Sequence, residues 1–200
     1  MTSWRSRIEA SILRSREMKG GNFFQLATVD GDNMPRVRTV VFRGFLGDAL
    51  TITTDARSQK VKESLCCEVC WWFPVTSEQY RLTATLSYEG HGTKLSQIRK
   101  DYWCKLSEKA QAQFYWKGHP KAAYAASGGE DTQTHAAIDE KPIASEREEN
   151  KDGNLTPPET FVLVLIEPTS CDYLRLTDNY RQIDTLNEDK TSWTSQRVYP

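Results

Sequence analysis

Side chains that can bind an anion gather where a predicted strand meets a predicted helix. They lie in "TITTDARSQKVKE", residues 51–63, and include Thr53, Thr54, Ser58 and Lys60. If a helix begins after Asp55, a suitable N-cap, its first backbone N–H groups and its dipole also favour an anion. The stretch therefore predicts an anion site at this junction, and the alternative is the solvated first turn of a surface helix.

Arginines on a neighbouring predicted strand can supply the guanidinium that a phosphate prefers. In "PRVRTVVFRGF" Arg36 and Arg38 share one face of the strand, because alternate residues of a strand point to the same side. Arg43 falls on the other face unless a bulge intervenes. A planar guanidinium can bind a phosphate through two parallel hydrogen bonds. Arg38 is therefore the predicted strand partner of the anion.

No standard catalytic motif occurs in the chain, neither G-x-S-x-G, a P-loop, G-x-G-x-x-G nor H-E-x-x-H. His91, His119 and His135 lie in predicted turns and loops, so acid–base catalysis has few groups to use. Any reactivity would then come from a bound cofactor. We name no catalytic residue.

The cysteines favour reduced thiols over a metal site. An odd number with adjacent members is unlike a disulfide framework, and the positions are Cys66, Cys67, Cys70, Cys104 and Cys171. The Cys67-x-x-Cys70 spacing suits a metal or a redox pair, but a structural zinc site needs about four ligands and no second pair is present. We predict buried, inert thiols and no metal.

Length and composition indicate one folded domain over residues 1–200. Hydrophobic residues make up 38% and charged residues 26%, which is typical of a globular protein. No apolar run approaches the ~20 residues that a membrane span needs. Residues 1–21 lack the apolar core of a secretory signal, and a transit peptide is the alternative interpretation. We therefore expect a cytoplasmic protein without a membrane partner.

Acidic charge is concentrated in one segment. Residues 127–159 carry nine Asp or Glu against three Lys or Arg, a balance of −6 in a chain whose net charge is −1. The rest of the chain is mildly basic, but its basic residues form no concentrated stripe, which argues against a nucleic-acid partner. The segment is too polar to offset its ordering entropy. We predict a mobile surface insertion, and the alternative is a structured binding arm.

Two helical regions are predicted outside the residue 56–65 helix that would follow Asp55. Trp4, Ile8 and Ile12 recur at helical spacing, so an amphipathic helix opens the chain. Residues 93–115 read as a second helical region, broken in two near residues 106–107.

Strands dominate the remainder. Residues 23–43 read as a β-hairpin, and "CEVCWWF", "QYRLTATLSYEGHG" and "FVLVLIEP" read as further strands. Strands come in runs rather than alternating with helices, which favours an antiparallel sheet. We expect a mainly β fold with flanking helices, an antiparallel β-barrel of seven or eight strands.

The order of four segments resembles one known family. They read "PRVRTVVFRGF", "LTITTDARSQKVKE", "CEVCWWFPVTSEQYRLTATLSYEG" and a C-terminal "DYLRL…W…RVYP". In this order they resemble the pyridoxamine 5'-phosphate oxidase-related FMN-binding split barrels, and most closely the Alr4036-type FMN-binding domain. The similarity spans the chain from about residue 4, without the acidic insertion. It implies a split β-barrel that forms a homodimer, with FMN at each end of the subunit interface and built from both chains.

The resemblance implies a phosphate-binding set. Arg38 matches the strand arginine on the FMN phosphate, and Arg43 stands where the oxidases have a lysine near phosphate and flavin. Ser58, Gln59 and Lys60 match a Ser-Arg-Lys triplet, in which Gln59 replaces the arginine and removes one charge.

Further positions are implied to meet the flavin. Thr53 and Thr54 match a strand-end pair whose backbone and hydroxyl contact flavin and phosphate. Arg81 falls where the oxidases have a glutamine reaching the ring, and Tyr173 falls near a tryptophan that packs beside the cofactor.

Aromatic residues outside these positions have two interpretations. They are barrel core and subunit interface, or one or two of them face the flavin ring. The set is Trp71, Trp72, Phe73, Trp103, Trp116 and Trp193.

The resemblance implies an FMN-binding flavoprotein, an oxidoreductase acting on an unidentified small molecule. A strict pyridoxamine or pyridoxine 5'-phosphate oxidase is one alternative. The oxidases bind that substrate with an Arg-x-His, where this chain has Asn179, Tyr180 and Arg181. A flavin-binding carrier without turnover is the other alternative.

Overall fold

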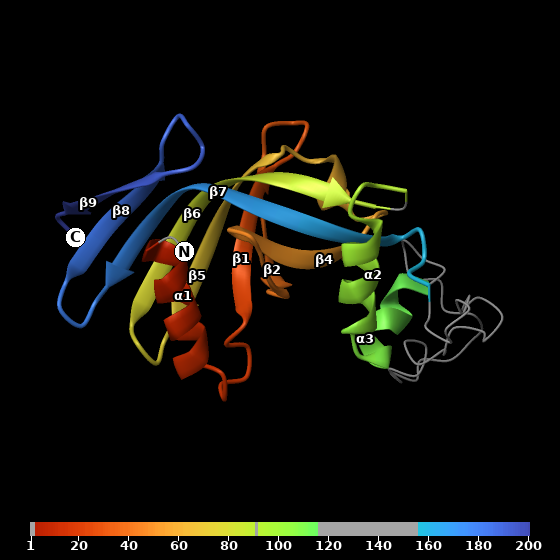
Figure 1. Ribbon diagram of the computed structural model, residues 1–200, viewed down its shortest axis with the longest axis horizontal. Coiled ribbons are helices and arrows are strands. Elements are labelled where there is room, and N and C mark those ends of the chain that lie inside the picture. Colours follow the sequence, from red (N-terminus) through yellow and green to blue (C-terminus); the bar gives the residue numbers. More distant parts are fainter. Residues whose placement is uncertain (1–2, 91, 116–155) are drawn as a thin grey trace, which may run out of the picture. The chain divides into compact units, whose positions relative to one another are not determined.

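The structure is a computed structural model that describes residues 3–90, 92–115 and 156–200 (Figure 1). The α-helices in this part of the chain are α1 (Ser3–Arg14), α2 (Ser96–Cys104) and α3 (Glu108–Ala112), and the 3₁₀ helices are η1 (Gln59–Lys62) and η2 (Gln113–Tyr115). The strands are β1 (Phe23–Val29), β2 (Pro35–Val41), β3 (Gly44–Leu46), β4 (Ala49–Asp55), β5 (Cys66–Phe73), β6 (Glu78–Glu89), β7 (Phe161–Arg175), β8 (Tyr180–Leu186) and β9 (Trp193–Val198).

The strands form one sheet in the order β2-β1-β5-β6-β7-β4-β3, with β8 paired to β7 and β9 to β8. The hairpin predicted for residues 23–43 is confirmed, because β1 and β2 pair antiparallel from Phe23↔Val41 to Val29↔Pro35. The pairs β1–β5, β5–β6, β7–β8 and β8–β9 are antiparallel as well. The prediction of a mainly β, antiparallel fold with flanking helices is therefore confirmed, whereas the expected seven or eight strands are too few, because the described residues form a nine-stranded sheet.

The chain divides into two compact units. The first comprises residues 1–53, 62–88 and 164–200, and the second comprises residues 54–61 and 89–163. The acidic insertion predicted at 127–159 lies outside the described residues up to residue 155. The single domain over residues 1–200 stays a prediction.

An aromatic core holds the first unit together. Trp71 is fully buried and its ring lies 5.2 Å from Phe24 and 5.0 Å from both Phe42 and Phe73. The period-2 pattern of β5 explains this, because buried and more exposed residues alternate along the whole strand. Trp71 and Phe73 are therefore core residues, whereas Trp72 between them is 42% exposed.

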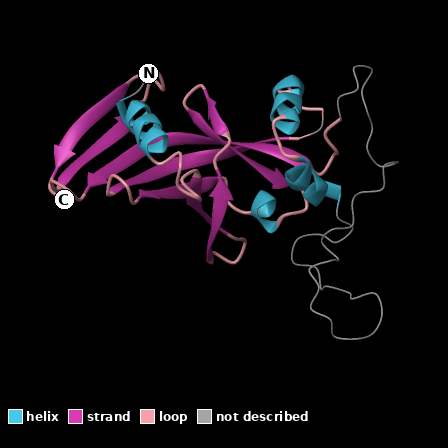
Figure 2. Cartoon of the chain, turned by 90° about the horizontal axis from the view of Figure 1, so that it is seen from below, coloured by secondary structure: helices cyan, strands magenta, loops and turns pink. Residues whose placement is uncertain are grey.

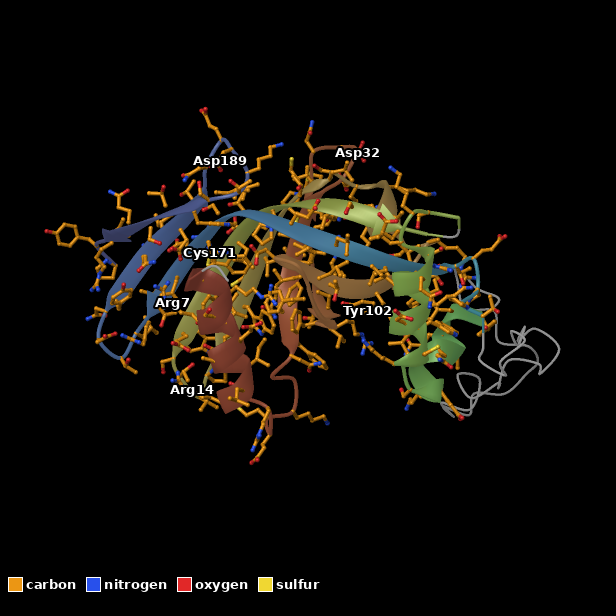
Figure 3. The ribbon with its side chains drawn as sticks, viewed as in Figure 1. Arg7, Arg14, Asp32, Tyr102, Cys171 and Asp189 are labelled. Atoms are coloured by element: carbon orange, nitrogen blue, oxygen red, sulfur yellow. The ribbon has the colours of Figure 1, made fainter. Side chains whose placement is uncertain are left out.

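The amphipathic helix predicted from the apolar spacing is confirmed as α1, which packs within the first unit. Trp4 and Ile8 are fully buried, and the Trp4 ring lies 5.4 Å from that of Trp193 on β9. Figure 2 shows the helix lying across strands of the sheet. Polar contacts add to this packing, because Arg7 donates hydrogen bonds to Gln182 and Asp184 on β8, at 3.0 and 3.3 Å. Figure 3 labels Arg7 on the helix and Cys171 on β7.

The second unit has a smaller aromatic core. The fully buried Trp103 of α2 lies 5.7 Å from Phe114 and 5.0 Å from Phe161. The predicted break near residues 106–107 is confirmed, because Ser107 is the N-cap of α3 and accepts a hydrogen bond from the backbone N–H of Ala110. None of the described helices is long and apolar enough to cross a membrane.

The prediction of an α-helix after Asp55 is wrong. The chain forms only the 3₁₀ helix η1, of four residues. The Asp55 carboxylate accepts hydrogen bonds from the Arg57 backbone N–H at 2.7 Å and from its guanidinium at 2.9 and 2.6 Å, which makes a local turn instead of a helix cap. The backbone N–H of Ser64 donates to the carbonyl of Val29 on β1 at 2.8 Å, so the chain has rejoined the sheet two residues after η1 ends. A helix dipole therefore cannot stabilise an anion at this junction, and any anion must be bound by side chains.

Candidate cofactor site

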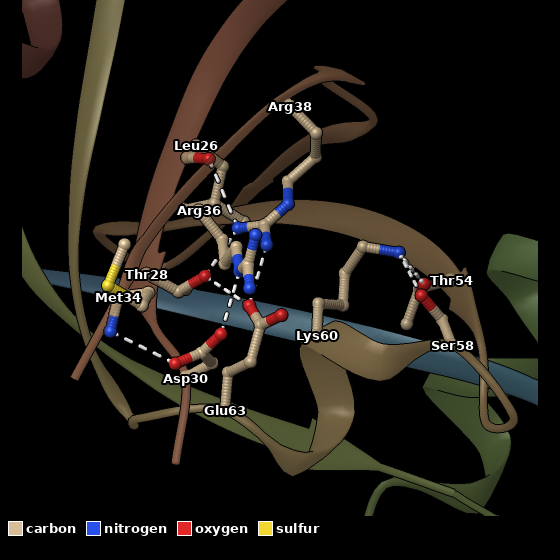
Figure 4. A network of polar contacts seen from close by, with 10 residues as sticks. All are labelled: Leu26, Thr28, Asp30, Met34, Arg36, Arg38, Thr54, Ser58, Lys60 and Glu63. Carbon is tan, nitrogen blue, oxygen red and sulfur yellow. Dashed lines mark hydrogen bonds and ion pairs between the residues drawn. The ribbon is translucent and has the colours of Figure 1, made fainter. Parts of the chain in front are cut away.

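The hydroxyls and the lysine of the predicted phosphate set lie together in the second unit. The Lys60 ammonium donates to Thr54 Oγ1 and to Ser58 Oγ, each at 2.7 Å (Figure 4). Thr54 and Ser58 are buried, at 5% and 8% exposure. Gln59 is exposed beside them on η1. The turn at Asp55 thus gathers one cation and two hydroxyls, which is a donor set that suits a phosphate.

Arg38 lies in the first unit, on β2, and is held from one side. Its Nη1 donates to the carbonyl of Leu26, at 3.2 Å, and to Thr28 Oγ1. Its Nη2 donates to Glu63 Oε2 at 2.6 Å, and Thr28 donates to the same carboxylate oxygen (Figure 4). The Arg38 side chain is 22% exposed and that of Glu63 only 3%. Arg38 is therefore a partly accessible cation paired with a buried acid, Glu63.

Arg36 and Arg43, the other two strand arginines, differ from Arg38. Arg36 is paired with Asp30 at 2.7 Å and is 46% exposed on its side chain. Arg43 follows β2, its backbone N–H donates to Thr51 at 2.8 Å, and its side chain is exposed. Within the described residues the Arg43 guanidinium has no hydrogen bond or ion pair. Arg43 is thus available to an external anion, as its predicted role requires.

Arg81 lies on the outer face of β6 and is already paired. Its Nε and Nη2 bond to Glu68 Oε1 at 2.8 and 2.7 Å, and Nη1 lies 3.9 Å from Asp172. The hydrogen bond with Glu68 raises the pKa of Arg81. Arg181 binds Asp172 through the same edge of its guanidinium, at 2.9 and 2.7 Å. Both arginines therefore meet a carboxylate within the chain.

Tyr173 lies on the other side of the sheet. It follows Asp172 on β7, so the two side chains point to opposite faces, and it is 2% exposed. Its hydroxyl donates to Glu78 Oε1 at 2.6 Å, and Ser11 of α1 donates to Glu78 Oε2, also at 2.6 Å. Tyr173 is thus part of the polar contact between α1 and the sheet, and its place does not support a contact with a flavin.

Arg38 and Arg81 also lie on opposite faces. Arg38 pairs in register with Leu26, Leu26 with Val69, and Val69 with Leu82. Directly opposed residues share a face, so Arg38 shares the face of Leu82 and Arg81 points the other way. The structure thus gathers Lys60 with Thr54 and Ser58, and separates Arg38 from Arg81 and Arg81 from Tyr173. Thr53, on β4 next to Thr54, is half-buried.

Sequence reasoning missed Glu63 and Thr28. Glu63 lies in the residue 56–65 segment for which the sequence predicts a helix that does not form, and Thr28 lies in a predicted strand with nothing to mark it as a polar partner. The sequence held no clear signal for them, because alternation places Arg36 and Arg38 opposite Val37 and Val41, so the arginine face reads as the solvent side. In the structure Val37 is instead 65% exposed, and Arg38 shares its face with the buried Leu26 and Val40.

The prediction of buried thiols is confirmed for Cys67 and Cys171 and wrong for Cys66 and Cys104, which are exposed. All five cysteines are free thiols, of which Cys67 and Cys171 are buried, Cys70 is half-buried, and Cys66 and Cys104 are exposed. Cys67 and Cys70 are three positions apart on β5 and so point to opposite faces. Burial raises the pKa of Cys67 to about 12, which keeps this thiol unreactive. In the part of the chain that the structure describes, no group of three or more His, Cys, Asp or Glu is placed to hold a metal.

Comparison with known proteins identifies the family. A family described as "Pyridoxamine 5'-phosphate oxidase, FMN-binding domain" matches residues 1–89. A pyridoxamine 5'-phosphate oxidase-related, FMN binding protein from Nostoc punctiforme is 30% identical, with a TM-score of 0.82 over 100% of this chain and 99% of that one. Pyridoxine/pyridoxamine 5'-phosphate oxidase 2 from Arabidopsis thaliana is 28% identical over 98% of this chain and 96% of its own length.

A third relative shows the fold alone. PhzG from Burkholderia lata, solved in complex with tetrahydrophenazine-1-carboxylic acid, has a TM-score of 0.70 at 14% identity. The fold is therefore the split barrel that the sequence predicts. The chain belongs to the pyridoxamine 5'-phosphate oxidase-related FMN-binding proteins, a flavin-binding family of oxidoreductase kind with FMN as its cofactor.

Proposed function

We propose that this chain is an FMN-dependent oxidoreductase acting on a small molecule, and that Arg38 binds the FMN phosphate. The observation that carries this is the free edge of Arg38. No described residue bonds to its Nε, whereas Arg81 and Arg181 bind carboxylates through Nε and Nη2 together. A phosphate accepts two parallel hydrogen bonds from such an edge.

The residues present fit a phosphate ester. Arg43 and Lys60 are cations, and Thr54 and Ser58 add hydroxyls, which are donors of the kind that a phosphate accepts. Gln59 remains a neutral, exposed donor in place of a third cation. When bound, the flavin supplies the redox chemistry, and these side chains bind and orient its phosphate.

The protein is proposed to work as a homodimer with FMN at the subunit interface. One cofactor can contact Arg38 and Arg81 only with difficulty within one protomer, because they lie on opposite faces of the sheet. Two protomers remove this conflict if one supplies the phosphate residues and its partner supplies Arg81.

An apolar sheet face supports the same proposal. Residues of β1, β2 and β5 that share the Arg81 face include exposed large side chains. They are Phe23 at 43%, Val29 at 39%, Val37 at 65% and Trp72 at 42% exposure. A second copy that covers this face would bury them.

The substrate is proposed to be other than a pyridoxamine phosphate. Arg181 is the remaining cation of the substrate motif of the oxidases, and Asp172 occupies its Nε–Nη2 edge. Binding a substrate phosphate there would require breaking this ion pair. A carrier without turnover remains the second candidate, favoured by the absence of a catalytic motif.

The first experiment is an absorbance spectrum of the purified protein and a titration with FMN. Flavin bands or uptake of one FMN per chain support the proposal, and no uptake refutes it. Anaerobic mixing with nicotinamide or candidate substrates then separates an enzyme, in which the flavin bleaches, from a carrier, in which it does not.

A hybrid dimer tests the shared site. Arg38→Ala and Arg81→Ala homodimers should each bind FMN weakly. A dimer with one chain of each kind should regain one normal site, because one pair of residues from the two chains stays intact. If every site lies within one protomer, the hybrid gains nothing.

A further inference from the structure

The guanidinium of Arg38 is held by one edge and open on the other. Arginine has five N–H groups in a fixed planar fork. Both N–H groups of Nη1 have acceptors, the Leu26 carbonyl and Thr28 Oγ1, and Nη2 donates to Glu63 Oε2. Because Thr28 and Glu63 are hydrogen-bonded to each other, they lie on the Nη1–Nη2 edge together. Nε and the second N–H of Nη2 form the remaining edge.

Other arginines of the first unit show the contrast. Arg175 donates from Nε and Nη2 to Asp178 at 2.9 and 2.8 Å, as Arg181 does to Asp172. These pairs use the Nε–Nη2 edge, which is the one that Arg38 keeps open. Arg7, like Arg38, donates from Nη1 and Nη2 instead. The acid next to Arg38 therefore lies on a different guanidinium edge from the acids next to Arg175 and Arg181.

We propose that Glu63 and Thr28 are positioning residues, which hold Arg38 so that its Nε–Nη2 edge is turned to the FMN phosphate. This inference rests on the proposed function, because Arg38 must be a phosphate ligand. Glu63 is suited to the task, since its carboxylate is 3% exposed and accepts hydrogen bonds from both Arg38 and Thr28. A long side chain fixed in advance loses less freedom when the ligand binds.

Glu63 has two opposing effects on the affinity for phosphate. Its negative charge attracts the same guanidinium and repels a phosphate close by. Its hydrogen bonds fix the direction of the guanidinium edge. If positioning dominates, losing the acceptor must weaken FMN binding, although it also removes a repelling charge.

The test compares affinities for FMN and for riboflavin, which lacks the phosphate, by quenching of flavin fluorescence. In Glu63→Ala we expect the preference for FMN over riboflavin to fall by about tenfold, the usual size for a misplaced charge-assisted hydrogen bond. Thr28→Val should lower it in the same direction. Glu63→Gln keeps a side-chain acceptor and should restore most of the preference.

Asp178→Asn is the matched control, because it also removes one carboxylate from an arginine pair of the first unit. It should leave the preference unchanged. The melting temperature of each variant is measured alongside, so that a folding defect is seen directly.

Three results would overturn the inference. An unchanged or increased preference in Glu63→Ala would make Glu63 a mere counter-charge. Equal weakening of FMN and riboflavin would make it a structural residue only, and failure of Glu63→Gln to restore the preference would exclude the acceptor role. A wild-type protein that binds no FMN would instead refute the proposed function itself.

Discussion

Replacing Tyr173 by phenylalanine should destabilise the protein in a pH-dependent way. The Tyr173 hydroxyl donates to the Glu78 carboxylate at 2.6 Å, and Glu78 is 4% exposed. Removing a hydrogen bond to a buried charged group costs about 2 kcal/mol of unfolding free energy. Burial raises the pKa of Tyr173, so the phenol stays a donor at ordinary pH. The ring remains in Tyr173→Phe, and only the hydrogen bond is lost.

The destabilisation should depend on pH because the acceptor, the Glu78 carboxyl, titrates. Burial raises the pKa of Glu78, but hydrogen bonds from Ser11 and Tyr173 and the charge of Arg14 lower it more, so its pKa lies below its ordinary value. A lowered folded-state pKa contributes stability above the unfolded value, and this stability is lost as the pH falls through the folded value. The penalty of Tyr173→Phe should therefore shrink from about 2 kcal/mol at neutral pH to about 1 kcal/mol in acid, where the acceptor is neutral.

The assay is urea unfolding followed by tryptophan fluorescence at both pH values. Tyr180→Phe is the matched control, because that hydroxyl donates at 2.6 Å to the neutral amide of Gln182. It should cost about 1 kcal/mol at either pH. The reasoning is refuted if Tyr173→Phe costs no more than the control, or if its penalty is the same in acid as at neutral pH.

Three further changes test other parts of the molecule. Lys60→Met should weaken FMN about tenfold and leave riboflavin nearly unaffected; equal weakening of both in a titration would contradict a phosphate role. Val37→Lys should shift a dimer to monomer in light scattering, since it charges the exposed sheet face; an unchanged mass would place the interface elsewhere. Arg99→Met should lower the melting temperature by roughly 3–8 °C, because the buried guanidinium donates to the carbonyls of Pro158 and Phe161; an unchanged temperature would show that water replaces it.

The elements that follow a simple repeat could be predicted from the sequence. Helix α1 has Trp4 and Ile8 on one face, and β5 alternates inward and outward residues, so each pattern identifies both the element and its buried side. The helix expected after Asp55 does not form, because the residue predicted as its N-cap makes a different contact. The carboxylate that could cap a helix instead binds Arg57, two residues away, and no periodicity distinguishes the two outcomes.

The site could be predicted only as a set of residue types. Whether an arginine is open to a ligand depends on the acid that it meets and on which edge of the guanidinium that acid binds. Arg38 meets Glu63, 25 positions away, and Arg181 meets Asp172, nine positions away on the facing strand, so spacing in the sequence does not identify either partner. The same residue type therefore takes opposite roles in one chain. In Arg181 the Nε–Nη2 edge is occupied by Asp172. In Arg38, Glu63 and Thr28 bind the other edge, so the Nε–Nη2 edge can donate two hydrogen bonds to a phosphate.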